Sequence, residues 1–188
     1  FTPKLLLKDM ELGMGAAKSL GVMMPTAAVT RESLQSLAHQ YPGDIDFSVL
    51  LLELARAAKK ANIPFTLATG SQTSMEEVAK EVGGTLWFQL YMWSDVRMSH
   101  TLVERAKNAG FEALVVTVDA PVLGTREADV RNRFSLPDGL LPANLLDAAP
   151  TEVRAAGDAS GLQQYFAANI DPALTWADID WLRSITAL

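Results

Sequence analysis

Four polar side chains lie at or just beyond the ends of two apolar stretches that resemble buried strands. Gln89 and Tyr91 leave the first stretch, Thr117 leaves the second, and Arg126 follows in the loop beyond it. A planar guanidinium can form a bidentate, charge-assisted clamp on a carboxylate. Apolar strands that deliver polar side chains at their carboxyl ends indicate an α/β layout in which this edge of the sheet forms the site.

The composition is that of an ordinary soluble globular protein, with 188 residues, 49% hydrophobic and 20% charged, which is enough for one domain with a core. A net charge of −6 argues against a nucleic-acid partner or an anionic membrane surface. No stretch approaches the ~20 apolar residues of a membrane span. The absence of cysteine excludes disulfides and thiol nucleophiles, no metal site is predicted, and a cytoplasmic location fits. Because the chain opens on Phe1 rather than Met, we expect a fragment, a processed form or the ordered part of a longer chain.

The first 52 residues are predicted to be entirely helical. One helix is expected over 4–20, with Leu6, Met10, Met14 and Ala17 on one face and Gly21 at its end. A second is expected from Pro25 or Thr26 to Tyr41, and a third from Phe47, capped by Asp46. No strand is visible before residue 64.

From residue 53 onward, short apolar strands alternate with helices. The strands are expected at 64–68, 86–91 and 113–118, and the helices between them begin at Ser74 and at Ser94 or Asp95. This order indicates βα units and a parallel sheet. Rossmann-like sheets and (β/α)8 barrels share it, and the missing glycine fingerprint favours a barrel. After an irregular stretch at 121–170 that ends in a short helix, a last helix opens at the Thr175–Asp178 capping box.

Several ordered motifs carry a resemblance over residues 53–188. They are SMEEVA at 74–79, WFQLY at 87–91, RAxxAG at 105–110, TVDAPVLGTREADVRNRF at 117–134 and LTWADIDWLR at 174–183. This portion closely resembles the FMN-dependent α-hydroxy acid dehydrogenases and oxidases, which include glycolate oxidase, lactate oxidase and mandelate dehydrogenase. The resemblance implies a (β/α)8 TIM barrel with FMN at its C-terminal mouth. It also implies oxidation of a small 2-hydroxy acid to the 2-oxo acid.

The resemblance also implies roles for individual residues. Gln89 and Thr117 would hydrogen-bond the flavin ring, and Ala68 stands where many members carry a flavin-contacting serine. Tyr91 would place its hydroxyl on the substrate, and Arg126 would bind the substrate carboxylate. Plainer roles are a glutamine at the edge of the core and an arginine paired with solvent or with neighbouring acids.

The family's remaining catalytic groups have no counterpart in this sequence. Its histidine base, the arginine beside that base and a flavin-contacting lysine would all come after residue 188, and the first barrel strand would precede this portion. His39 and His100 do not match the histidine base, so no catalytic residue is assigned. We therefore expect a partial barrel that is incomplete or inactive in this chain alone, and whether it acts as an enzyme stays open.

The first segment carries a different resemblance. Its matching residues are Phe1-x7-Asp9 with Lys8, GVMMP at 21–25 and YPGDIDFS at 41–48. As a set they resemble the C-terminal helical domain of the 3-hydroxyisobutyrate dehydrogenase family, which implies that Lys8 contacts an NAD or NADP cofactor. A solvated lysine is the simpler interpretation. The two resemblances predict a fusion of a helical segment, 1–52, to a partial barrel, 53–188.

Three functions follow from this organisation. The first is FMN-dependent oxidation of a small 2-hydroxy acid, the second is a fragment of an NAD(P)-dependent 3-hydroxyisobutyrate-type dehydrogenase, and the third is a non-catalytic fusion or scaffold. An open partial barrel leaves an edge strand and one apolar face uncovered. The helical segment can cover part of that face, a homo-oligomer can cover it, or the fold can be marginally stable.

Overall fold

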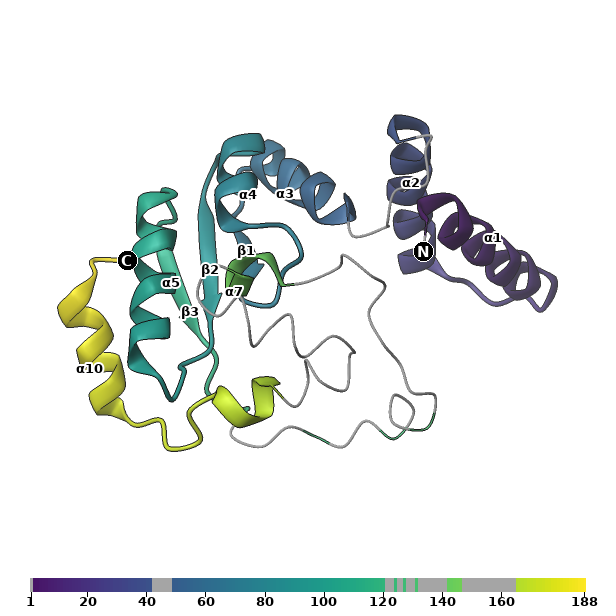
Figure 1. Ribbon diagram of the computed structural model, residues 1–188. Helices are drawn as coiled ribbons and strands as arrows, with labels where there is room; N and C mark the ends of the chain where they lie inside the picture. The colour runs from purple at the N-terminus through teal and green to yellow at the C-terminus, as the bar shows by residue number, and fades with distance from the viewer. Residues whose placement is uncertain are drawn as a thin grey trace. The chain divides into compact units, whose positions relative to one another are not determined.

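The computed structural model describes residues 2–41, 49–120, 124, 127, 131, 142–146 and 165–188. The chain divides into two compact units, Phe1–Ala57 and Ala58–Leu188, which are described separately below (Figure 1). The predictions for Phe1, for the Asp46 helix cap and for Arg126 lie outside the described residues.

The first unit contains a pair of helices, α1 (Pro3–Ser19) and α2 (Pro25–Gln40). The predicted inner face of α1 is confirmed, since Ala17 is buried and Leu6, Met10 and Met14 are half-buried. Leu34 and Leu37 on α2 are fully buried. Arg31 of α2 lies 3.3 Å from the Glu11 carboxylate of α1, and Gly21, with φ +68°, ends the first helix as predicted.

Helix α3 (Leu50–Ala61) spans the boundary between the units. On the side of the first unit, the Arg56 guanidinium donates to the Glu53 carboxylate at 2.6 Å and to the Tyr41 hydroxyl at 3.4 Å. These two hydrogen bonds, that to Tyr41 first, raise the pKa of Arg56. On the other side, Lys59 Nζ donates to the Val82 carbonyl at 2.6 Å.

The second unit is built on a parallel sheet with the strand order β1–β2–β3. Its strands are β1 (Phe65–Ala68), β2 (Leu86–Leu90) and β3 (Ala113–Val116), close to the three predicted strands. The last strand ends two residues earlier than predicted, so Thr117 lies beyond it. The Thr117 N–H still donates to the Leu90 carbonyl at 3.0 Å, which holds this residue beside the end of β2.

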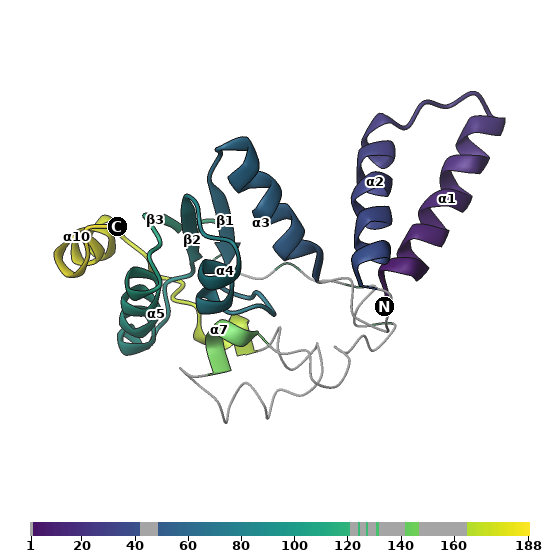
Figure 2. The ribbon, with the colours of Figure 1, turned by 90° about the horizontal axis from the view of Figure 1, so that it is seen from above.

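Helices α4 (Met75–Glu81) and α5 (Val96–Asn108) connect the strands and lie on the same side of the sheet (Figure 2). Helix α4 begins at its N-cap Ser74 as predicted, with a capping box between Ser74 and Glu77, and Asp95 rather than Ser94 caps α5. The inner face of α5 buries five residues, Met98, Ser99, Leu102, Val103 and Ala106. On this side the sheet itself buries Leu67, Leu86, Phe88 and Leu90.

The opposite face of the sheet is more open. Alternate residues point to opposite faces of a strand, and neighbours in register share a face. Gln89 pairs in register with Ala68 on one side and Val115 on the other, so these three residues share the open face. Trp87 is on this face too, and it and Val115 are 36% and 38% exposed.

The second half of this unit includes the helices α7 (Ala143–Leu146) and α10 (Trp176–Ile185). Helix α7 was not predicted, whereas the Thr175–Asp178 capping box of α10 is confirmed. Residues 165–169 are helical. Residues 92–94, just beyond β2, pair with 169–171 through two backbone hydrogen bonds of 2.8 and 2.9 Å. None of the described helices combines the length and the apolar character that a membrane crossing requires.

Candidate cofactor site at the carboxyl edge of the sheet

The Gln89 side chain joins the carboxyl ends of all three strands. Its Oε1 accepts the Thr69 N–H at 3.1 Å, and its Nε2 donates to the Thr117 hydroxyl at 2.8 Å. The Thr69 hydroxyl in turn donates to the Gln89 carbonyl at 2.5 Å. Gln89 and Thr117, which the sequence assigned to one site, are therefore in direct contact, and Thr69 joins them.

These contacts fix which way the Gln89 amide points. A backbone N–H can only donate, so Oε1 must face Thr69 and the NH₂ group must face Thr117. Because the Thr117 hydroxyl accepts from Gln89, its own proton stays available for an acceptor within the part of the chain that the structure describes. One Nε2 hydrogen of Gln89 also stays available among the described residues. The edge thus carries two hydrogen-bond donors side by side.

Ala68 adds a small apolar surface beside these donors. It is the register partner of Gln89, and its methyl group is exposed. The following residue, Thr69, is fully buried, and its hydroxyl is held by the Gln89 carbonyl. Thr69 therefore does not supply the hydroxyl that a serine at position 68 would carry.

Tyr91 begins an aromatic cluster next to the donor pair. Its ring meets Phe166 edge to face at 6.2 Å, and Phe166 lies 5.5 Å from the ring of Trp93, both measured between ring centroids. Tyr91 is half-buried, while Trp93 is almost fully buried. Trp93 Nε1 is the one buried side-chain nitrogen or oxygen without a hydrogen-bond partner among the described residues. Phe166 was not singled out in the sequence, because it lies in the irregular stretch.

Helix α7 packs against the loop that follows β1. Its Asn144 is fully buried, and the Asn144 Oδ1 accepts the Met75 N–H at 2.8 Å. The Asn144 Nδ2 donates to the carbonyls of Ala68 and Thr69 at 3.3 and 3.4 Å. The Ala143 N–H also donates to the Ser71 carbonyl at 2.8 Å. A segment far along the chain therefore anchors the residues beside the donor pair.

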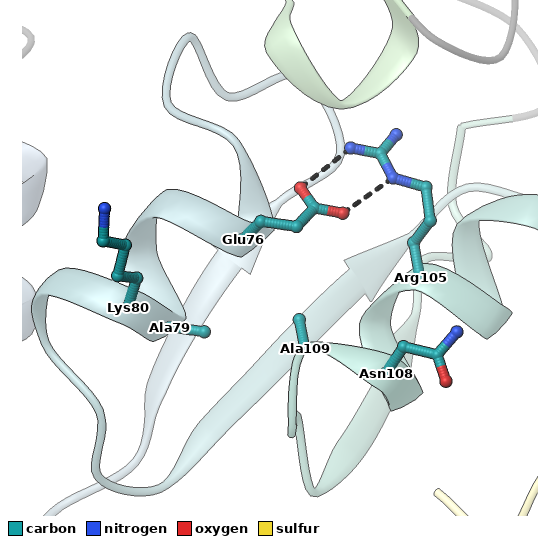
Figure 3. A pocket seen from close by; sticks show the side chains of 6 residues that line it. All are labelled: Glu76, Ala79, Lys80, Arg105, Asn108 and Ala109. Atoms are coloured by element: carbon teal, nitrogen blue, oxygen red, sulfur yellow. Dashed lines mark hydrogen bonds and ion pairs between the residues drawn. The ribbon is translucent and has the colours of Figure 1, made fainter.

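An ion pair lies on the outer side of α4 and α5 (Figure 3). Arg105 grips the Glu76 carboxylate through Nε and Nη2 at 2.8 and 2.9 Å, and its Nη1 donates to the Asn144 carbonyl at 2.7 Å. The hydrogen bond from Arg105 is the main reason that the pKa of Glu76 is lowered. The pair lines a groove of about 600 Å³ from which the Lys80 side chain extends away.

A family match covers most of this chain. The model of a family described as FMN-dependent dehydrogenase matches residues 33–188. The chain belongs to this family. An L-lactate oxidase from Nostoc sp. is 49% identical over 142 residues, which cover 73% of this chain and 39% of the relative. Glycolate oxidase 1 from Oryza sativa subsp. indica is 38% identical over 189 residues, covering 100% of this chain and 48% of the relative. The chain thus spans about half the length of the glycolate oxidase.

Solved structures agree with this assignment. A mandelate oxidase with (S)-4-hydroxymandelic acid is 38% identical, with a TM-score of 0.64 over 78% of this chain and 42% of that chain. A mutant of an active chimera of (S)-mandelate dehydrogenase is 34% identical, with a TM-score of 0.59 over 77% of this chain. The three parallel strands are therefore part of a TIM-barrel fold, as predicted.

The family match also extends into the first segment. It begins at residue 33, inside the range 1–52 that the sequence assigned to the 3-hydroxyisobutyrate dehydrogenase resemblance. The alignment with glycolate oxidase 1 covers the whole chain. Neither match shows the 3-hydroxyisobutyrate-type segment.

The other sequence candidates make no hydrogen bond to the donor pair among the described residues, or lie outside those residues. His100 is exposed on α5, and His39 belongs to the first unit. Lys8, also in the first unit, is 60% exposed and lies 3.4 Å from the Asp9 carboxylate. Arg126 falls in the undescribed stretch. Across the described ranges, no cluster of three or more histidines and acidic residues could hold a metal ion.

Proposed function

We propose that the carboxyl edge of this sheet binds FMN, with Gln89 and Thr117 hydrogen-bonded to the flavin ring. The observation that carries the proposal is the fixed Gln89 amide, which leaves two donors side by side on the open face. A flavin ring presents carbonyl oxygens and ring nitrogens along one edge, and such a donor pair suits them. Membership of the FMN-dependent dehydrogenase family supports the same cofactor.

Ala68 fits this proposal because a small side chain lets a flat ring approach the sheet. Its methyl group is exposed on the same face as Gln89. A bound FMN would supply the acceptance of two electrons from a substrate, which no amino-acid side chain provides. The role of the chain here is to orient the ring and to keep its polar edge hydrogen-bonded.

We infer that the substrate is a small 2-hydroxy acid, which is oxidised to the 2-oxo acid. The names of the matched L-lactate oxidase and glycolate oxidase support this class. Tyr91 lies two residues beyond Gln89 on the same strand end, so its hydroxyl is the proposed contact to the substrate. Arg126, outside the described residues, is the proposed clamp on the substrate carboxylate.

The proposal assigns no catalytic base to the described residues. A base must reach the proton that it removes through a hydrogen bond or one water. His100 projects from an exposed position on α5, and His39 is exposed near the end of α2. We therefore propose that this chain alone binds FMN without turning over a hydroxy acid.

The test is a titration of the protein with FMN, followed by the change in flavin fluorescence and visible circular dichroism. Saturable binding is expected for the wild type. Gln89→Leu keeps the approximate volume and removes the amide, so we expect affinity to fall about tenfold or more. Gln35→Leu, an exposed glutamine of α2, is the matched control and should leave affinity unchanged. Absence of FMN binding by a folded wild-type sample would contradict the proposal.

The alternative cofactor, NAD or NADP contacted by Lys8, has weaker support. The Lys8 side chain is largely exposed and pairs with its neighbour Asp9. Titration with NADH, followed by its fluorescence, should show no saturable binding. Saturable binding that Lys8→Met abolishes would instead favour the 3-hydroxyisobutyrate-type fragment. A non-catalytic scaffold would bind neither cofactor.

A further inference from the structure

We propose that Asn144 is a positioning residue for the cofactor site, which acts through the Ala68–Thr69 peptide group on the Gln89 amide. The inference rests on the proposed FMN site and adds to it a residue of α7 that does not belong to the three strand ends. Asn144 is hydrogen-bonded to the backbone beside the site, at Met75, Ala68 and Thr69. Among the described residues it makes no hydrogen bond to Gln89 or Thr117.

The first step is that the Asn144 amide has one defined orientation. Its oxygen faces the Met75 N–H, a group that can only donate, so its NH₂ must face the two carbonyls. The side chain is fully buried, and every polar atom of its amide has a partner. A buried amide that is satisfied in this way is costly to rotate, because rotation would leave donors and acceptors unpaired.

The second step is a property of a single peptide group. The Ala68 carbonyl accepts from Asn144, and the Thr69 N–H of the same peptide group donates to Gln89 Oε1. A peptide group is planar, and its C=O and N–H point in opposite directions. Asn144 and Gln89 therefore hold the same plane from its two ends. If that plane turned, the hydrogen bond that orients the Gln89 amide would break.

The third step is that Asn144 is itself held from the outer surface. The Asn144 carbonyl accepts from Arg105 Nη1, while the rest of the guanidinium grips Glu76. Arg105 belongs to α5 and Glu76 to α4, so both helices between the strands fix the position of α7. The Ala143 hydrogen bond to Ser71 adds a further anchor on the loop after β1.

The key variant is Asn144→Asp, which has nearly the same shape. When ionised, its carboxylate keeps an acceptor for the Met75 N–H but has no proton to donate to the Ala68 carbonyl, so the variant is measured at alkaline pH, because burial favours the neutral acid. The variant thus loses the hydrogen bond to the Ala68 carbonyl and keeps the hydrogen bond from the Met75 N–H. Leu145→Ala is the matched control, because Leu145 is the fully buried neighbour on α7 and its loss lowers stability without touching an amide.

The first measurement needs no flavin. The two Nε2 protons of Gln89 and the Thr69 amide proton give separate NMR signals in labelled protein. In Asn144→Asp we expect the Gln89 signals to shift and the Thr69 amide to exchange faster with solvent. In Leu145→Ala both should stay close to the wild type. Equal changes in the two variants, or none in Asn144→Asp, would overturn the positioning role.

The second measurement is the affinity for FMN. Groups that orient a ligating side chain typically change affinity roughly 10- to 100-fold when removed, as known for metal sites. We expect Asn144→Asp to weaken FMN binding about tenfold in the wild-type background. In the Gln89→Leu background, the same change should cost less than about twofold, because coupled residues are not additive. Additive losses would overturn the inference.

The two measurements separate this inference from the proposed function. If the wild type binds no FMN while Asn144→Asp still shifts the Gln89 signals, the flavin proposal fails and the positioning role stands. If the wild type binds FMN and Asn144→Asp changes neither its affinity nor the signals, the positioning role fails alone.

Discussion

The two faces of the three-stranded sheet are formed by the same short strands, yet they differ in almost every property. On the helix-covered face, Leu67, Phe88 and Leu90 are fully buried beneath α4 and α5 (Figure 2). On the open face, Ala68 is exposed, and Gln89 is only half-buried while its amide joins the strand ends. The alternation of side chains along each strand separates the two roles.

The two faces separate the residues that stabilise the fold from those available to bind a ligand. Buried apolar area on the covered face contributes roughly 25 cal/mol for each Å² removed from water. The open face buries less apolar area and so contributes less to stability. It carries instead a polar amide, a hydroxyl and a small methyl group. Substitutions on the two faces should therefore change different measurements.

The largest expected effect is on the covered face. Phe88→Ala removes a fully buried ring that meets Phe111 edge to face at 6.0 Å between centroids. We expect the free energy of unfolding to fall by about 3–5 kcal/mol, measured by urea denaturation. Phe88→Leu, which retains much of the volume, is the control and should cost distinctly less. An unchanged midpoint for Phe88→Ala would show that this face is not the core.

The next effect concerns the open face and the cofactor. Thr117→Val replaces a hydroxyl by a methyl group of the same shape, so the donor next to Gln89 disappears. We expect FMN affinity to fall by about five- to tenfold, with a stability change below about 1 kcal/mol. Thr101→Val on the exposed side of α5 is the control. A large loss of stability without loss of affinity would reverse the assignment of the two faces.

A smaller effect is expected at the ion pair behind the covered face. The folded pKa of Glu76 lies below its ordinary value of 4.5, because Arg105 stabilises the carboxylate. The pair therefore stabilises the fold above pH 4.5, and this contribution is lost as the pH falls through the lowered pKa. Since the Glu76 side chain is 49% exposed, we expect less than about 1 kcal/mol at neutral pH.

The measurement for this pair is the unfolding free energy of Glu76→Gln across pH. The difference from the wild type should be present near neutral pH and vanish in acid. Glu112→Gln, an exposed glutamate of the same unit, removes a charge of equal sign and serves as the control. A difference that grew as the pH fell would have the wrong sign for a carboxylate stabilised by Arg105.

The smallest effect is expected for an apolar side chain on the open face. Val115→Thr should change the unfolding free energy by about 0.5 kcal/mol or less, because the side chain is 38% exposed and threonine keeps its shape. Measuring it at two protein concentrations makes the result sharper. A loss of several kcal/mol that depends on concentration would show that a second copy covers this face, as a homo-oligomer would.

The covered face and the strand ends were predictable because they follow local rules. Apolar runs bounded by glycine and by helix caps predicted the three strands. Gln89 was recognised as a candidate because it is a polar residue near the end of an apolar strand. The capping boxes at Ser74 and Thr175 depend on residues only three apart. Such signals can be read from a single sequence.

The parts that sequence reasoning missed depend on contacts between distant residues. Thr69 directly follows Ala68 in the sequence. Its contact with Gln89, however, depends on the register between β1 and β2, which the sequence does not reveal. Asn144 lies in a helix of four residues, too short for a periodic pattern, within an irregular stretch. The end of β3 was placed two residues too late, because Thr117 and Val118 continue the apolar, β-branched run beyond the last paired residue.

The span of the Asn144 contacts has a consequence for the order of folding. The Asn144 side chain is hydrogen-bonded to the backbone of Met75 and of Ala68. These residues lie 69 and 76 positions before it in the sequence. Closing such long loops costs entropy that local contacts do not. During synthesis, which runs from the N-terminus, the strands and their connecting helices emerge well before α7. The sheet can thus assemble early. The Gln89 amide takes its final orientation only after α7, which is synthesised later, has packed against the loop that follows β1.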